Sequence, residues 1–71
     1  MKEYVVIYEQ AEHNWCAYVP DLPGCITTGP TLSDTRANIK EAIEGHVQVM
    51  RETGESIPEP TSIADTIPVA A

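Results

Sequence analysis

Large aromatic side chains are scarce in this 71-residue sequence, which has Tyr4, Tyr8, Trp15 and Tyr18 and no phenylalanine. A chain of this length buries only about 60% of the surface that it exposes when unfolded, so its own core gives marginal stability. Hydrophobic residues still make up 42% of the sequence, which is typical of a folded globule and not of a disordered tail. We therefore expect one small domain over residues 1–71 that a second copy or another partner helps to stabilise.

Basic residues are also few. Four Lys and Arg stand against eleven Asp and Glu, and the net charge is −7. Lys2, Arg36, Lys40 and Arg51 are scattered and form no run. Binding to phosphates requires clustered Lys and Arg, so we do not expect this chain to bind nucleic acid directly. An acidic surface instead favours encounter with a basic protein.

The sequence has two cysteines, Cys16 and Cys25, which are too few for a disulfide framework. Lys2 is followed by an acid and the apolar run over residues 4–8 is short, so no signal peptide is expected. No stretch approaches the roughly 20 apolar residues of a membrane span. We expect a cytoplasmic protein with reduced thiols and no membrane partner.

The first half of the chain predicts three strands. Residues 4–8 are all β-branched or aromatic, and residues 15–19 form the returning strand after a polar loop in which Asn14 tolerates positive φ. Pro20 ends the second strand, and Pro23-Gly24 fits a type II turn with Gly24 at positive φ. Residues 25–28 follow as a short third strand, which Gly29-Pro30 ends.

The clearest pattern is a helix after Thr31, which is a good N-cap with Asp34 three residues later. Gly54 is the expected C-cap. One side of this helix carries an apolar stripe, and the opposite side carries acids. The stripe consists of Leu32, Ile39, Ile43, His46 and Met50, widened by Ala42 and Val47.

The end of the chain predicts an extended connector over residues 57–60 and a last strand over residues 62–69. Pro68 confines that strand to a sheet edge or ends its pairing. The expected fold is α+β with the order β-β-β-α-β. It is a three-stranded antiparallel meander with one helix packed on a face, and the last strand returns to it, with a place beside the first strand as one arrangement.

Several motifs together resemble the N-terminal domain of the HicB antitoxin family. They are Tyr4-Val5-Val6-Ile7-Tyr8-Glu9, the run from Trp15 to Val19 followed by Pro20-Asp21-Leu22-Pro23-Gly24-Cys25, then Gly29 and Thr31, the acidic amphipathic helix, and Gly54-Glu55-Ser56-Ile57-Pro58-Glu59-Pro60. The resemblance covers nearly the whole chain. Any one of these motifs alone would be weak, but the combination is specific.

The resemblance implies a partial ribonuclease-H-like fold without nuclease activity. It also implies association into dimers or higher oligomers and neutralisation of a small basic HicA-like toxin, which cleaves mRNA. Many family members carry a further C-terminal DNA-binding segment. This sequence stops soon after Val69, so we expect no such segment here, which puts autoregulation by this chain in doubt. The alternative is a stand-alone oligomeric module, structural or ligand-binding, that has no toxin.

Two kinds of chemical site are weighed and set aside. Ribonuclease-H chemistry needs carboxylates that hold two Mg²⁺ ions about 4 Å apart, and nothing in the spacing of Glu9, Asp21 and Asp34 demands such a cluster. A zinc site would draw on ligands without the short spacing of known sites, namely His13, Cys16, Cys25 and His46. We expect no catalysis, metal or cofactor.

The sequence therefore predicts a binding protein with two interaction surfaces. Its partner-facing residues are an aromatic residue and acids that attract a basic toxin: Tyr18, Asp21, Asp34, Glu41, Glu44 and Glu52. Its oligomer interface combines the first strand with the helix stripe: Tyr4, Val6, Tyr8, His46, Val47 and Met50.

Overall fold

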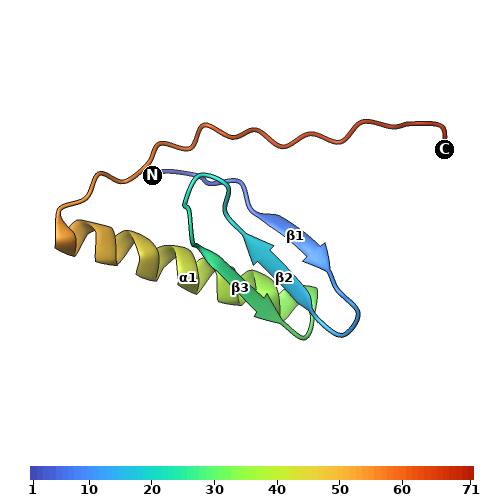
Figure 1. Cartoon of the computed structure of the whole chain (residues 1–71), viewed down its shortest axis with the longest axis horizontal. Coiled ribbons are helices and arrows are strands. Elements are labelled where there is room, and N and C mark those ends of the chain that lie inside the picture. Colours follow the sequence, from blue (N-terminus) through green and yellow to red (C-terminus); the bar gives the residue numbers. More distant parts are fainter.

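The computed structural model describes residues 1–71 and forms a sheet of three strands followed by one helix. The elements are β1 (Ile7–Gln10), β2 (Trp15–Tyr18), β3 (Ile26–Gly29) and α1 (Leu32–Thr53). Neighbouring strands are antiparallel in the order β1-β2-β3, and α1 lies along one side of the sheet (Figure 1). The α+β class, the antiparallel meander and the packed helix are therefore confirmed.

The β1–β2 hairpin differs from the sequence prediction at both ends. Strand β1 begins at Ile7 and not at Tyr4, because Tyr18, the partner of Ile7, is the last residue of β2. The loop closes with a hydrogen bond from the Ala11 N–H to the Asn14 carbonyl at 2.8 Å. No residue other than glycine has positive φ, so the expectation of a left-handed Asn14 is wrong.

The turn between β2 and β3 follows the prediction. Gly24 has φ 84°, and the Cys25 N–H donates to the Leu22 carbonyl at 3.0 Å. This turn places Leu22 in the core, where it is fully buried. The complete set of buried hydrophobic residues is small: Ala17, Val19, Leu22, Cys25 and Ile39.

Both predicted helix caps are confirmed. The Thr31 hydroxyl oxygen accepts from the Asp34 N–H at 3.0 Å, and the same hydroxyl donates to the Asp34 carboxylate at 2.9 Å. At the other end, Gly54 takes the left-handed conformation with φ 75°, and its N–H donates to the Arg51 carbonyl at 3.3 Å.

The predicted last strand does not form. Residues 62–69 pair with no strand of this chain. The chain after α1 instead runs extended past the N-terminus and then away from the sheet (Figure 1). Pro58 and Pro60 have no N–H to donate, and the N–H groups of Thr61 and Ser62 both donate to the Asp21 carboxylate. The backbone that would have led into a sheet is thereby held by a side chain.

Helix α1 is not apolar enough over its length to cross a lipid bilayer.

Candidate interaction surfaces

The face of the sheet turned away from α1 carries a row of three apolar side chains. Ile7 pairs with Tyr18, and Tyr18 pairs with Ile26, so their side chains stand side by side across the three strands. Ala17, the residue before Tyr18 in β2, is fully buried on the helix side, as the alternation of a strand requires. Ile26 is 61% exposed and Tyr18 is 37% exposed. Apolar side chains exposed in this way suit contact with another protein. We call Ile7, Tyr18 and Ile26 the sheet row.

The acids predicted to face a partner lie elsewhere. Glu41, Glu44 and Glu52 are exposed on α1, whose core-facing residue Ile39 packs toward the opposite side. Asp34 is also exposed, but its carboxylate belongs to the N-cap interaction with Thr31. The structure therefore does not bring Tyr18 and the helix acids onto one surface. The sheet row and these acids lie on opposite sides of the molecule.

Asp21 holds the C-terminal chain. Its carboxylate accepts the N–H of Ser62 at 2.9 Å and the hydroxyl of Ser62 at 2.8 Å. It also accepts the N–H of Thr61 at 3.1 Å and the hydroxyl of Thr61 at 3.2 Å. The hydrogen bonds from Ser62, backbone first, favour the ionised form and lower the pKa of Asp21 from its ordinary 3.8. Asp21 is thus an anchor for the chain after α1.

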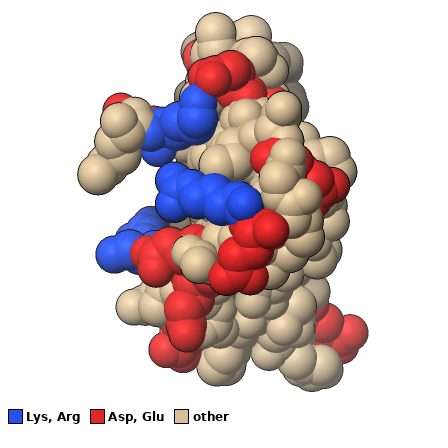
Figure 2. Space-filling model, turned by 90° about the vertical axis from the view of Figure 1, so that its left-hand side faces the viewer, with Lys and Arg blue, Asp and Glu red and all other residues tan.

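The basic residues, scattered in the sequence, gather in space. Arg36, Lys40 and Arg51 point from α1 within about 60° of one another around the helix axis, because successive residues of a helix are rotated by about 100°. Lys2 lines the same hollow as Arg51, and the Arg36 guanidinium carbon lies 5.8 Å from the centre of the Tyr8 ring of β1. Figure 2 shows the Lys and Arg side chains along one side of the molecule, with Asp and Glu among them. We call these four residues the basic flank, and it lies on the β1 side of α1.

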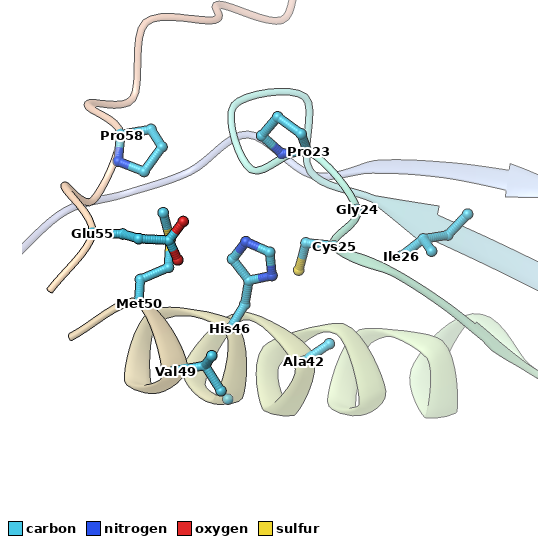
Figure 3. A pocket seen from close by; sticks show the side chains of 11 residues that line it. Pro23, Gly24, Cys25, Ile26, Ala42, His46, Val49, Met50, Glu55 and Pro58 are labelled. Atoms are coloured by element: carbon cyan, nitrogen blue, oxygen red, sulfur yellow. The ribbon is translucent and has the colours of Figure 1, made fainter. Parts of the chain in front are cut away.

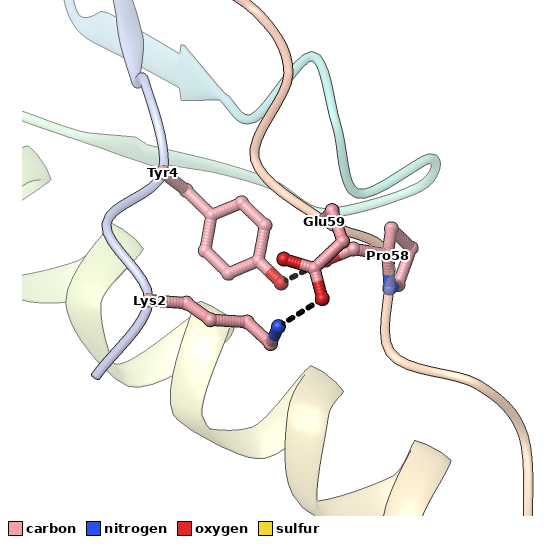
Figure 4. A network of polar contacts seen from close by, with 4 residues as sticks. All are labelled: Lys2, Tyr4, Pro58 and Glu59. Atoms are coloured by element: carbon pink, nitrogen blue, oxygen red, sulfur yellow. Dashed lines mark hydrogen bonds and ion pairs between the residues drawn. The ribbon is translucent and has the colours of Figure 1, made fainter.

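A hollow of about 800 Å³ opens at one end of the basic flank. Its apolar lining includes Tyr4, Ile43 and Val47. Figure 4 shows how the chain after α1 closes one side, where the Tyr4 hydroxyl donates to the Pro58 carbonyl and the Lys2 ammonium pairs with the Glu59 carboxylate, both at 2.5 Å.

A second hollow, of about 660 Å³, lies between the β2–β3 turn and the C-terminal half of α1. Figure 3 shows the His46 ring rising from α1 into this hollow, between Cys25 and Glu55. Burial raises the pKa of the Cys25 thiol, which keeps it protonated and a poor nucleophile. The rest of the lining is largely apolar, with Met50 and the 55% exposed Val49 at one side. The hollow therefore suits the binding of a ligand or partner better than catalysis by His46 and Cys25.

The predicted oligomer interface is divided between these hollows. Tyr4 and Val47 line the first hollow, while His46 and Met50 line the second. Two further members, Val6 and Tyr8, pack at the rim of the core. Sequence reasoning missed Ile26 and Val49. The alternation of the third strand contained the signal for Ile26, since Cys25 and Thr27 point the other way.

The residues weighed for catalysis and metal binding remain apart. No three His, Cys, Asp or Glu residues are placed so that they could hold one metal ion. Cys16 pairs in register with Thr28, whereas Cys25 is buried beneath the other side of the sheet, so the two thiols do not meet. Both cysteines are free.

Comparison with protein families matches residues 4–69 to the model described as the HicB_like antitoxin of bacterial toxin-antitoxin systems. An uncharacterized 14.9 kDa protein of Haemophilus phage HP1 is 38% identical over 64 residues, which cover 90% of this chain and 48% of that protein. The chain therefore spans about half the length of this relative. A UPF0150 protein of Thermoplasma acidophilum is 38% identical over 58 residues, 82% of this chain and 84% of that protein.

Two solved structures share the fold. A chain from the HicA3 and HicB3 toxin-antitoxin complex superposes with a TM-score of 0.73 and 27% identity, covering 84% of this chain and 70% of that chain. A protein from Thermus thermophilus superposes with a TM-score of 0.71 and 29% identity, covering 90% of this chain and 82% of that chain.

Proposed function

Because this chain belongs to the family of HicB_like antitoxins of bacterial toxin-antitoxin systems, we propose that it binds and occludes a basic, HicA-like ribonuclease toxin in the cytoplasm. The mechanism is steric: the antitoxin covers the toxin surface that would otherwise hold mRNA. The chain itself performs no chemistry and needs no cofactor. The likeness to a chain from a HicA3–HicB3 complex supports this kind of partner.

The observation that carries the proposal is the exposed sheet row. Ile7, Tyr18 and Ile26 form an apolar strip on a sheet face that α1 does not cover. An aromatic anchor such as Tyr18, once buried by a partner, typically dominates the binding energy of a protein interface. The sheet row therefore supplies the contact area with the toxin.

The net charge of −7 has a second role in this mechanism. A toxin that holds RNA must carry a basic surface, and opposite charge accelerates encounter more than it strengthens the final complex. Exposed acids on α1, such as Glu41 and Glu52, contribute to this attraction at a distance from the sheet row.

The proposal predicts that a gene beside that of this chain encodes a small basic protein, and co-expression of the two proteins tests it. We expect that protein to arrest growth alone, and we expect this chain to relieve the arrest and to elute with it as one complex. Ile26→Asp places a charge in the sheet row and should abolish both effects. Val49→Asp is the matched control, because Val49 is similarly exposed at 55% but lies on α1.

Loss of binding in both variants would assign the contact to the hollow that Ile26 and Val49 share, and not to the sheet row. Normal growth on expression of the neighbouring protein, with no complex, would refute the antitoxin function. That outcome would favour the second candidate, a stand-alone oligomeric module with a structural or ligand-binding role.

Either function is served by a homo-oligomer, which we propose in its simplest form, a dimer. Five buried hydrophobic residues make a small core, and several apolar residues remain largely exposed. Burial of that surface against a second copy stabilises both chains. Sedimentation that shows a 7.8 kDa species alone at micromolar concentration would contradict this.

A further inference from the structure

We propose that residues 63–69 of one chain add as a fourth strand to the free edge of β1 in a second copy of the chain, in a reciprocal exchange. We call residues 63–69 the tail segment. The inference concerns how two copies meet and holds whether or not a toxin exists.

The tail segment has the pattern of a strand without a sheet. Ile63, Ile67 and Val69 are 92%, 76% and 78% exposed, although they are large and apolar. In an extended chain the odd-numbered residues share one side, so these three side chains lie on one side of the segment, with Asp65 between Ile63 and Ile67. Large apolar side chains exposed together on one side of a segment mark a surface for contact with another chain.

The anchor at Asp21 directs the tail segment outward. Thr61 and Ser62 are held by four hydrogen bonds to the Asp21 carboxylate, and the tail segment starts at the next residue. From there it leads away from its own sheet (Figure 1). No glycine follows Gly54, so the sequence favours no tight reversal that would bring the segment back. A second copy is therefore the partner that the segment reaches.

The free edge of β1 can accept a strand. Strand β1 pairs with β2 on one side and with nothing on the other. At the opposite edge of the sheet, the Asn38 amide already donates to the Thr28 carbonyl of β3 at 3.0 Å. Residues 4–6, just before β1, are strand-forming in sequence but make no backbone–backbone hydrogen bond. Residues 4–10 and the tail segment both span seven residues, so their lengths match.

The charges of the two surfaces are complementary. The basic flank borders the β1 edge, whereas the chain as a whole carries −7. The tail segment has one charged residue, Asp65, and its odd number places it on the same side as the three apolar residues. With that side turned toward α1, Asp65 meets the basic flank and the apolar residues meet half-buried Tyr8 and Val47.

The position of Pro68 agrees with this arrangement. Proline cannot donate to a sheet ladder and is found on edge strands, where its nitrogen faces solvent. A fourth strand beside β1 would be the outermost strand and can tolerate Pro68. Its even-numbered residues would widen the sheet face that bears the sheet row, so the second copy would also contribute to that surface.

Disulfide trapping in the full chain tests the exchange directly. Both variants carry Cys16→Ala and Cys25→Ala, which remove the natural thiols. Each has Gln10→Cys at the exposed end of β1. The second cysteine is Ile63→Cys in one variant and Val69→Cys in the other. Position 63 approaches position 10 in an antiparallel arrangement, and position 69 approaches it in a parallel one. We expect one of the two pairs to give a covalent dimer on mild oxidation.

The other trapping outcomes overturn the proposal. A disulfide within one chain would mean that the tail segment folds back onto its own β1. Absence of any disulfide in both variants, with circular dichroism showing folded protein, would mean that the segment does not approach this edge.

A second experiment uses sedimentation of the chain alone, so that its failure is distinct from failure to bind a toxin. Ile63→Asp/Ile67→Asp should raise the dimer dissociation constant by about 100-fold or more, because two apolar side chains lose their burial. Ala64→Asp/Thr66→Asp adds the same charge to the other side of the segment and should leave a dimer. Equal dissociation constants for the two variants would refute the exchange.

Discussion

Asp21 and Ser62 are joined by two hydrogen bonds although 41 residues separate them in the chain. The carboxylate lies in the turn after β2, and the serine N–H and hydroxyl both donate to it. Thr61 adds two more hydrogen bonds to the same carboxylate. This contact fixes where the chain after α1 leaves the body of the protein and where the tail segment begins.

We predict that the contact of Asp21 with Thr61 and Ser62 persists as the pH is lowered until the Asp21 carboxylate becomes protonated, and is lost then. The folded-state pKa of Asp21 lies below its ordinary 3.8, so ionised Asp21 contributes stability that is complete above pH 3.8. That contribution is lost as the pH falls through the lowered value. A carboxyl titration followed by NMR should therefore place Asp21 below 3.8, and a value at or above 3.8 would contradict the anchor.

The variant Asp21→Asn tests the same contact at neutral pH. It removes the charge that makes the carboxylate a strong acceptor, so the amides of Thr61 and Ser62 should exchange with solvent faster. Asp65→Asn is a matched control within the same part of the chain, because the Asp65 carboxylate accepts from the neighbouring Thr66 N–H alone. Equal exchange rates in the two variants would show that Asp21 does not hold the chain.

Two glycine substitutions should have opposite effects on stability. A Cβ at Gly45, inside α1, would meet nothing within 4 Å, so Gly45→Ala should stabilise the protein by about 0.4–1 kcal/mol. A Cβ at Gly29 would lie 2.5 Å from the Thr35 hydroxyl and 2.8 Å from the Thr35 nitrogen, so Gly29→Ala should destabilise it by about 1–3 kcal/mol. Urea denaturation measures both. A destabilising Gly45→Ala would show that another chain packs against this position.

The features that sequence predicted correctly depend on local chemistry. Thr31 caps the start of α1 and Gly54 caps its end through contacts with residues at most four positions away, so the residue types alone identify both caps. The same holds for the turn at Gly24. The features that were predicted wrongly depend on distant contacts. Strand β1 starts at Ile7 because of where β2 ends, and the predicted strand over residues 62–69 begins at a residue, Ser62, whose N–H already donates to distant Asp21.

The candidate surfaces show the same division. Tyr18 was identified from sequence, and strand alternation carried a signal for Ile26, but the placement of Ile7 and Ile26 on either side of Tyr18 becomes visible only once the strand register is known. The grouping of Arg36, Lys40 and Arg51 was present in the helical spacing and was overlooked because the residues are distant in sequence. The position of Lys2 beside them required the fold.

We predict that the purified protein has no nuclease activity that depends on Mg²⁺ or Mn²⁺. Glu9 lies on β1, Asp21 holds the chain after α1, and Asp34 caps α1, so these carboxylates have separate positions and partners. Two-metal chemistry requires them to converge. A fluorogenic RNA assay checks this. Activity that persists through several columns and disappears in Glu9→Gln would overturn the prediction.

Association with a HicA-like toxin should be fast and sensitive to salt. Exposed charges are screened beyond about 8 Å at physiological ionic strength, and they act mainly on the association rate. Raising the salt from about 50 to about 500 mM should therefore slow association clearly and change dissociation much less. Stopped-flow or surface-based kinetics can measure both rates.

The helix acids should account for part of this effect. Asp34 is left unchanged because it caps α1, so the variant is Glu41→Gln/Glu44→Gln/Glu52→Gln. It should associate more slowly without unfolding, because exposed substitutions usually change stability by no more than about 0.5 kcal/mol each. Glu12→Gln, which removes an exposed charge from the β1–β2 loop, provides a comparison away from α1. An association rate indifferent to both salt and the triple substitution would mean that the charge does not steer the toxin, and would favour the function without a toxin.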